Sequence, residues 1–430
     1  MNKKIIIIIA IFLISVLGLF FFYEPPQIYD SKNEGNTESN TLSKSPEEGS
    51  IGDLFKPRES TAANFDWSNG QCKGKKGTVP LTAAPMNPEN IAVIYPYGTI
   101  DPESGHVTPI DHQYYYPKNR EQGPDLYDIF APADGYIVLI AKRNRFVSEE
   151  GGINPVPDYY IVMEHSCSFW TYFDLVTSLV PEIQEEVGQL PDDEVFVSRG
   201  VRIPIKAGQR MGKIGLRSLD FGVYDSETKL SGFLVYKHYD GEPWKVHTVD
   251  PYDFFVEPIK SQLIAKTPRT AKPIGGKVDY DIDGKVIVNW FVEGSGGFPM
   301  KYKDKSWRDH LAIFPDAFDP AQFVFSHGNI AGRAQSYGIK KENPNPAIVG
   351  VDTGLVKYEL VNFEYFIKDT NNPWNRLTYT EEVLSKPNTK VEGTALAQLI
   401  EPRKLKVEVF MGKTATQVSV FTNNAVMYER

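Results

Sequence analysis

The stretch Lys206-Ala-Gly-Gln-Arg-Met-Gly-Lys-Ile-Gly215 decides how its part of the chain folds. Its three glycines, Gly208, Gly212 and Gly215, lack a Cβ atom, so they permit turns and let neighbouring backbones approach closely. Glycines at such short spacing suit short strands packed into a compact all-β core. We therefore expect a β-sheet around this stretch.

The sequence on both sides of the stretch predicts a mainly β protein. Short runs rich in β-branched and aromatic residues alternate with Gly, Pro, Asn and Asp, which is typical of strands and turns. One helix is expected over residues 175–190, where apolar residues recur every three to four positions and Pro181 lies near the start. The expected strands cover residues 91–95, 135–141, 159–164, 201–205, 277–281, 285–291, 356–360, 363–367, 404–410 and 417–421.

The first 62 residues have a different character. Lys3 and Lys4 precede an apolar run over residues 5–22, which at about 1.5 Å per residue is long enough to cross a bilayer core. The run ends in aromatic residues rather than in a signal-peptidase site, so we expect an uncleaved single-pass anchor over 1–23. The positive-inside rule places the N-terminus in the cytoplasm and the rest of the chain outside the cell membrane. Residues 24–62, rich in Ser, Asn, Glu, Pro and Thr, are predicted to form a disordered linker.

Composition limits the domain count and the partners. The 430 residues are enough for two or three domains. A net charge of −9 and the lack of a basic stripe in the sequence argue against nucleic acid as a partner. A change in composition over 260–273 separates two predicted domains, 63–259 and 274–430. We expect the second domain to be a β-barrel or sandwich of calycin-like size.

An acidic motif opens this second domain. Asp279, Asp281 and Asp283 alternate as in the first half of a calcium-binding loop. The twelfth position is Trp290, where an EF-hand needs a bidentate glutamate. The Asp283-Gly284 pair also favours a tight turn. We therefore expect a hairpin between 277–281 and 285–291 rather than a calcium site.

Five blocks follow one another in the first domain. They are Ala131-Pro-Ala-Asp-Gly-Tyr-Ile-Val138, Tyr160-Ile-Val-Met-Glu-His165, Thr171-Tyr-Phe-Asp-Leu175, the stretch from Lys206 to Gly215, and Ser218-Leu-Asp-Phe221. In this order they resemble the M23 metallopeptidases of the LytM and lysostaphin type. The resemblance spans about residues 91–255 and implies a β-sheet core of the duplicated hybrid kind. In active members it implies zinc-dependent cleavage of the peptide cross-links of bacterial cell walls.

Compared residue by residue, the resemblance implies a degenerate catalytic site. A hydrolytic zinc site needs three protein ligands and an open position for water. The family takes its ligands from His-x-x-x-Asp and the second His of His-x-His, and the matching residues here are His112, Tyr116 and Asp220. The family's supporting histidines are replaced by Ser218 and Asp174. Because only His112 is retained, we expect no peptidase activity and no cofactor. The alternative is a zinc ion held by His112 and Asp220.

The histidine is also part of a short polar cluster. His106, Asp111 and His112 offer three possible metal ligands within seven residues. The turn formers around them indicate instead that these side chains hydrogen-bond to loop backbone.

Aromatic residues suggest what a degenerate groove could do. Tyr116, Trp170 and Tyr172, with Asp174 and Ser218, are expected to line it and could stack on sugars or grip a peptide. The same aromatic residues could simply pack the two faces of strands. We expect binding or scaffolding at the cell envelope, with a glycan, a peptide or a protein as partner. Two alternatives stay open: a metallohydrolase with a rearranged zinc site, and small-molecule binding by the C-terminal barrel.

Cys72 and Cys167 are the only cysteines of the chain. In an extracellular protein we expect them to form a disulfide that closes a loop of about 95 residues. The alternative is that Cys167 is a small buried residue.

Overall fold

The structure, a computed structural model, describes residues 65–102, 106–149, 152–190, 196–298 and 309–430. All of them belong to one compact unit, Gly49–Arg430. The predicted anchor over 1–23 and the predicted linker over 24–62 both lie outside the described residues. Among the helices of the described ranges, none is both long and apolar enough to span a bilayer.

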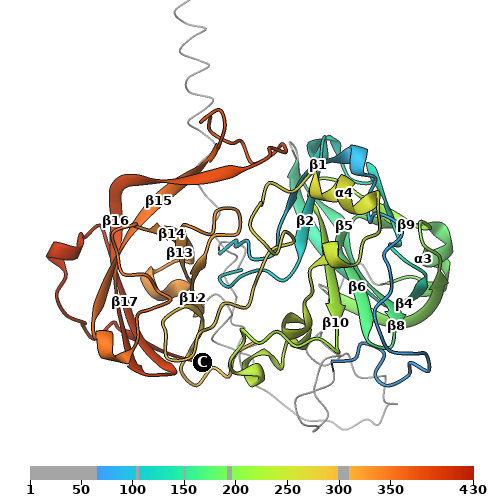
Figure 1. Ribbon diagram of the computed structural model, residues 1–430. Helices are drawn as coiled ribbons and strands as arrows, with labels where there is room; N and C mark the ends of the chain where they lie inside the picture. Colours follow the sequence, from blue (N-terminus) through green and yellow to red (C-terminus); the bar gives the residue numbers. More distant parts are fainter. Residues whose placement is uncertain (1–64, 103–105, 150–151, 191–195, 299–308) are drawn as a thin grey trace, which may run out of the picture. The chain divides into compact units, whose positions relative to one another are not determined.

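The fold is mainly β, as predicted, and its first half is built on a seven-stranded antiparallel sheet. Neighbouring strands are joined by regular antiparallel ladders, for example between β10 and β6. In the order of their hydrogen bonding, which Figure 1 helps to follow, the strands are β1 (Ile91–Tyr95), β2 (Gln113–Pro117), β10 (Leu219–Asp225), β6 (Phe169–Val176), β5 (Gly152–Ser166), β4 (Gly135–Glu149) and β8 (Phe196–Ile205). The expected strand over 91–95 is confirmed, and those over 135–141, 159–164 and 201–205 are parts of longer strands.

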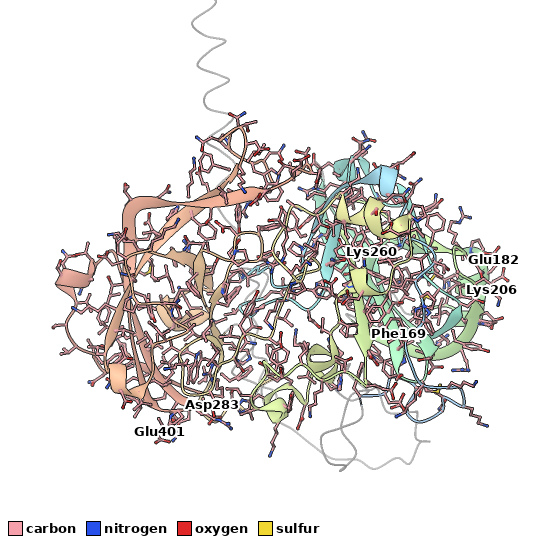
Figure 2. The ribbon with its side chains drawn as sticks, in the orientation of Figure 1. Phe169, Glu182, Lys206, Lys260, Asp283 and Glu401 are labelled. Atoms are coloured by element: carbon pink, nitrogen blue, oxygen red, sulfur yellow. A yellow bond between two sulfur atoms is a disulfide. The ribbon has the colours of Figure 1, made fainter. Side chains whose placement is uncertain are left out.

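A three-stranded sheet packs with this sheet in one hydrophobic core. Its strands are β3 (Tyr127–Phe130), β9 (Arg210–Ile214) and β7 (Ser178–Leu179). Phe169 of β6 is completely buried in the core, whereas the side chains of Glu182 and Lys206 are exposed (Figure 2). We call the two sheets and their connections the sheet region. The short helices of this region are η1 (Pro88–Asn90), η2 (Arg120–Gln122), α3 (Pro181–Val187), η3 (Tyr236–Tyr239), η4 (Pro243–His247), η5 (Pro251–Asp253) and α4 (Ile259–Ile264).

The glycines of the opening stretch do what the sequence predicts. Gly208 has a φ of 73° and allows the turn that leads into β9. A Cβ atom at Gly212 would overlap the carbonyl oxygen of Ser178 in β7, and one at Gly215 would overlap the carbonyl oxygen of Gly123. Backbones therefore meet at these two positions as closely as the absence of a side chain permits.

Replacing Gly212 by alanine is expected to lower the free energy of unfolding by about 1 to 3 kcal/mol, because β7 must move away from β9. Gly200, in β8, is the matched control, since its backbone is not left-handed and a Cβ there would meet open space. Gly200→Ala should change the free energy by less than about 0.5 kcal/mol. Urea unfolding of the two variants beside the parent chain measures both values, and equal stabilities would contradict the assignment.

The helix predicted over 175–190 is shorter than expected. Leu175 lies at the end of β6, Leu179 lies in β7, and only Pro181–Val187 is helical. Strand pairing explains the difference, because Val176 pairs with Tyr159 of β5 and residues 178–179 pair with β9. The apolar spacing indicates correctly that Leu179, Ile183, Val187 and Leu190 face the core, but a strand and a helix share that face. Leu175 is not part of the core.

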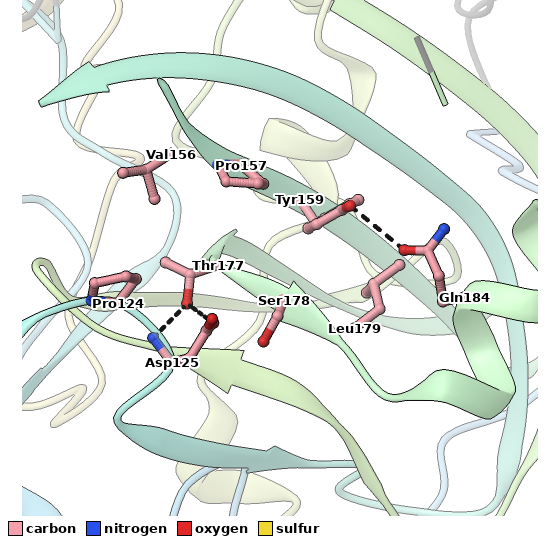
Figure 3. Close-up of a pocket in the computed structure, with 9 residues that line it drawn as sticks. All are labelled: Pro124, Asp125, Val156, Pro157, Tyr159, Thr177, Ser178, Leu179 and Gln184. Atoms are coloured by element: carbon pink, nitrogen blue, oxygen red, sulfur yellow. Dashed lines mark hydrogen bonds between the residues drawn. The ribbon is translucent and has the colours of Figure 1, made fainter. Parts of the chain in front are cut away.

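A shallow hollow of about 310 Å³ lies along residues 177–184 (Figure 3). Thr177 closes one side, where its hydroxyl donates to the Asp125 carboxylate over 2.6 Å and accepts the Asp125 N–H over 3.0 Å. Tyr159 of β5 and Gln184 of α3 close the other side through a hydrogen bond of 3.4 Å. The segment is thus fixed by polar contacts on both sides of the short strand β7.

The second half of the fold is a closed antiparallel barrel, so the barrel expected in the C-terminal part is found rather than the sandwich. One hydrophobic cluster takes residues from every strand and fills the interior, including Trp290, Phe325, Tyr358 and Tyr428. The strands, in chain and spatial order, are β11 (Val288–Val292), β12 (Leu311–Pro315), β13 (Phe323–His327), β14 (Gln335–Ile339), β15 (Val356–Ile367), β16 (Val383–Glu401), β17 (Lys404–Met411) and β18 (Val426–Glu429). The short helices are η7 (Asn329–Ala331), η8 (Val351–Thr353) and η9 (Ala415–Gln417).

Two expectations for this half are wrong. Asp283 and Gly284 do form a turn, but residues 277–281 are not a strand, so no hairpin forms there. The carboxylates of this segment bind a distant loop instead. Asp279 accepts the backbone N–H of Gly232, and Asp281 accepts that of Leu234. Residues 417–421 are not a strand either. Their first residue, Gln417, ends η9 instead, and both the N–H and the hydroxyl of Thr414 donate to its side chain.

The connection between β15 and β16, residues 368–382, reaches the sheet region, and we call it the strap. The Tyr95 hydroxyl donates to the Arg376 carbonyl oxygen over 2.7 Å, and the Tyr379 N–H donates to the Ala92 carbonyl oxygen over 3.0 Å. Trp374 of the strap is buried in a cluster that also contains Val93 of β1. The strap therefore covers β1, the edge strand of the sheet, and the Lys266 carbonyl oxygen contributes by accepting the Ile94 N–H over 2.8 Å.

Candidate functional site

His112 lies between two carboxylates at the start of β2. Its Nε2 atom is 3.4 Å from the Asp220 carboxylate of β10, and its Nδ1 atom is 3.6 Å from the carboxylate of Asp111. Strand pairing produces this arrangement, because β2 and β10 are hydrogen-bonded neighbours. Ser218, next to β10, donates its hydroxyl to Asp220 over 3.1 Å. All four side chains are buried.

A buried lysine completes the arrangement. Lys245, in η4, lies 2.9 Å from Asp111 and 3.1 Å from Glu242. The Tyr224 hydroxyl adds a hydrogen bond of 3.3 Å to Asp111. Burial opposes ionisation of Asp111, but Lys245 and His112 hold its pKa well below the usual range. Asp111 is therefore ionised, with a cation on either side, and we call the group His112, Asp111, Asp220, Ser218 and Lys245 the charged cluster.

Protonation of His112 opposes zinc binding by the charged cluster. Burial alone would lower the pKa of His112, but the Asp111 and Asp220 carboxylates raise it to about 9. An imidazolium has no free lone pair for a metal. Burial and the charge of Asp220 raise the pKa of Tyr116 to about 12, so its phenol is neutral at pH 7. The three positions that the resemblance equates with zinc ligands therefore do not form a fitting ligand set, and the described ranges hold no group of three or more His, Cys, Asp or Glu that could bind a metal.

The position equated with a supporting histidine, Asp174, is also occupied by an ion pair. Its carboxylate contacts the Arg143 guanidinium, which lies 3.4 Å from Asp158 as well. Asp174 stands directly opposite Asp220 in the pairing of β6 with β10. Arg143 thus neutralises a carboxylate that would otherwise face the acidic side of the charged cluster.

The charged cluster borders a cleft of about 1020 Å³ between the sheet region and the barrel. Of the residues expected to line a groove, Tyr116 and Ser218 line this cleft together with Asp220. Trp170 and Tyr172 instead lie in a buried cluster with Phe65, Trp67 and Tyr224. The aromatic residues along the cleft are Tyr95, Tyr114, Tyr116, Phe314, Phe318, Phe363 and Tyr365.

Several cleft residues were missed by sequence reasoning. Phe314, Phe318 and Tyr365 belong to the barrel region, and Arg376 belongs to the strap. No local pattern links these residues to the sheet region, because the fold alone brings the two regions together. Lys245 was missed too, because its place next to Trp244 in an otherwise polar segment gave no signal that its side chain is buried.

Cys72 and Cys167 form a disulfide in the structure, with 5.6 Å between their Cα atoms. It joins the N-terminal segment of the described chain to the turn between β5 and β6. Hydrogen bonds surround it, since the Cys167 N–H donates to the Lys75 carbonyl oxygen over 2.9 Å and the Gly77 N–H donates to the Ser168 hydroxyl over 2.7 Å.

The stability of the protein is expected to fall as the pH rises through about 9, the pKa of His112 in the folded protein. The folded pKa lies above the ordinary value of 6.5, so the stabilisation is complete below about pH 6.5 and is lost above about 9. The loss should amount to roughly 3 kcal/mol of unfolding free energy. Urea unfolding between about pH 6 and about pH 10 measures it. His112→Gln removes the titrating group and should flatten the profile, and an unchanged slope in that variant would refute the assignment.

The solved structures that this chain resembles weakly include the following two. A chain of the SpoIIQ–SpoIIIAH pore-forming complex has 13% sequence identity and a TM-score of 0.24, and the match covers 43% of this chain and 96% of that chain. The solution structure of lysostaphin has 12% identity and a TM-score of 0.23, with 71% and 98% covered. No family model and no curated protein matches the sequence. No family assignment follows from these comparisons.

Proposed function

We propose that the chain is a non-catalytic binding or scaffolding protein of the cell envelope, with a degenerate M23-like sheet region held outside the membrane by the segment 1–23. The cleft would hold an envelope glycan, a peptide or a partner protein without cutting it. The proposal is supported above all by the pairing of His112 with Asp220 at 3.4 Å, at the positions that the sequence resemblance equates with two zinc ligands. The neighbouring pairs of Lys245 with Asp111 and Arg143 with Asp174 extend the same pattern.

This pattern replaces a catalytic set with internal ion pairs. A hydrolase needs ligands that are free to bind a metal and a base that is free to take a proton. Here each of the acidic and basic side chains already has a partner of opposite charge. The cleft beside them still offers aromatic and polar groups, which is what binding without turnover requires.

The alternative of a small molecule inside the barrel has less support. Trp290, Phe325, Tyr358 and Tyr428 are all almost completely buried in the cluster that fills the interior. The Trp290 indole N–H already donates to the Val286 carbonyl oxygen over 2.7 Å. A ligand would have to displace these side chains to enter.

Metal content and turnover test the proposal. The full chain is purified in detergent without chelators, beside His112→Ala and the control His238→Ala, and zinc is measured together with hydrolysis of cross-linked cell-wall peptides. We expect the three proteins to have the same low zinc content and no turnover. Near-stoichiometric zinc and turnover that disappear only in His112→Ala would make a rearranged metallohydrolase the better assignment.

Binding is the second part of the test. Soluble envelope fragments are titrated into the full chain and into Tyr116→Ala, whose ring borders the cleft. We expect the variant to bind at least about tenfold more weakly, as is usual for a central aromatic contact. Equal affinities would place the binding site outside the cleft.

A further inference from the structure

Two arginines from distant parts of the chain flank one end of the cleft. Arg120 begins η2 of the sheet region, and Arg376 lies in the strap; both line the cleft. The Arg120 guanidinium carbon is 5.2 Å from the centre of the Tyr116 ring, and that of Arg376 is 4.5 Å from the centre of the Tyr365 ring. Each guanidinium therefore has one side on an aromatic ring while its edge remains available for hydrogen bonds.

Two tyrosines in contact, Tyr95 and Tyr116, connect the two arginines. The rings of Tyr95 and Tyr116 are 4.7 Å apart, and the Tyr95 hydroxyl donates to the backbone carbonyl oxygen of Arg376. Arg376 has a φ of 61°, an uncommon conformation for a residue other than glycine. The Asn375 side chain stabilises this turn by accepting the N–H groups of Leu377 and Thr378. The strap thus holds Arg376 at a fixed place beside Tyr95.

Two of the four acidic residues that line the cleft, Asp220 and Asp316, are engaged by groups other than the arginines. Asp220 pairs with His112, and Asp316 accepts the Tyr365 hydroxyl over 2.5 Å and the Phe318 N–H over 2.9 Å. The arginines are less constrained. The carboxylate nearest to Arg120 is that of Glu121, at 3.7 Å, whose side chain is 83% exposed. Glu121 also lines the cleft and balances the charge of Arg120. Within the described part of the chain, Arg376 makes no ion pair, so its positive charge is the one without an acidic partner at this end of the cleft.

We propose that Arg120 and Arg376 form an anion subsite that takes a carboxylate of a bound peptide. Guanidinium groups pair with carboxylates through two parallel hydrogen bonds, which favours this chemistry. The inference rests on the proposed function and narrows its ligand to a peptide with a free carboxyl group.

The packing of the aromatic rings favours a peptide over a glycan. Tyr95 meets Phe318 edge to face, at 4.9 Å and 86°, and Phe318 meets Trp374 at 5.2 Å and 73°. These rings cover one another's faces, whereas a sugar needs an open ring face for stacking. A peptide needs only apolar contact and hydrogen-bonding groups along its backbone.

The test compares two forms of one probe, N-acetyl-trialanine as the free acid and as the C-terminal amide. Calorimetric titration uses the full chain in detergent and the variants Arg376→Gln and Arg120→Gln. The control is Arg210→Gln, an arginine of β9 whose side chain is half-exposed and lies outside the cleft. We expect the acid to bind at least about tenfold more tightly than the amide, because it adds charge-assisted hydrogen bonds. Either cleft variant should reduce the affinity for the acid to that for the amide, and the control should change neither.

The other outcomes overturn the subsite in distinguishable ways. Equal affinities of the parent chain for acid and amide would remove the subsite and leave the cleft as a binding site. Failure of both forms to bind at about 10 mM would refute both the subsite and the assignment of a peptide as the ligand. The proposed role at the envelope would then be tested by the titration with envelope fragments alone. Displacement of the acid by inorganic phosphate at equal concentration would assign the two arginines to anions in general rather than to a peptide.

Discussion

Replacing Cys72 and Cys167 by serine is expected to lower the free energy of unfolding by about 4 to 5 kcal/mol. The disulfide closes a loop with a sequence separation of 95, so its removal gives the unfolded chain much more conformational freedom. In the folded state it ties the N-terminal segment to the turn between β5 and β6. The same segment is also held by the hydrogen bonds of Gly77 with Ser166 and Ser168 and by the packing of Phe65 and Trp67 against Trp170.

Urea unfolding of the double variant in detergent, beside the parent chain with and without a reducing agent, measures this effect. The reduced parent should match the variant, and the variant should not respond to the reducing agent. Ser168→Ala is the control, because it removes the hydrogen bonds of the Ser168 hydroxyl with Gly77 and Glu227 and keeps the disulfide, and it should cost only about 1 to 2 kcal/mol. A loss below about 1 kcal/mol in the double variant would show that the loop is constrained by other contacts in the unfolded state.

Lys245→Met is expected to destabilise the sheet region by about 3 to 5 kcal/mol. The substitution keeps the side-chain length but leaves the ionised Asp111 carboxylate buried beside a single cation, His112. Combining Lys245→Met with Asp111→Asn should recover most of the loss, since no fully buried carboxylate is then left without its lysine. Glu242 also loses Lys245, but its side chain is 31% exposed and keeps contact with solvent. Thermal or urea unfolding of the single and double variants forms a double-mutant cycle.

The control for this prediction is Lys206→Met. Lys206 lies 2.8 Å from Asp134, nearly the distance between Lys245 and Asp111, but both side chains are mostly exposed. Exposed pairs contribute little, so this variant should lose less than about 1 kcal/mol. Similar losses in the two lysine variants would mean that burial of the charged cluster does not determine its energy.

Much of the fold could be predicted from local sequence, because strands and turns leave short-range patterns. The run over 91–95 becomes β1 without change, and Gly212 marks the place where β7 and β9 meet. The exceptions are positions where tertiary pairing overrides spacing. Leu175 and Leu179 have helical spacing but join strands, and Asp281 accepts a backbone N–H group from a distant loop instead of forming a hairpin.

The candidate site could be predicted only in part. The resemblance indicated His112 and Asp220, and the structure brings them together across β2 and β10. Their roles depend on Lys245 and Arg143, which neutralise the adjacent carboxylates and come from elements with no recognisable motif. Arg376 could not be foreseen either, since only the folded strap places it at the cleft.

The closure of the barrel has a consequence for biosynthesis. β11, the first strand of the barrel, pairs with β12 on one side and with β18, the last, on the other. A ribosome that adds about 5 to 20 residues per second needs on the order of 10 s to make the chain between these two strands. During this interval one edge of β11 has no partner strand, although it is flanked by large apolar side chains such as Trp290 and Phe291. We expect the nascent barrel to be most vulnerable to aggregation at this edge, and to depend most on chaperones, until β18 has been synthesised.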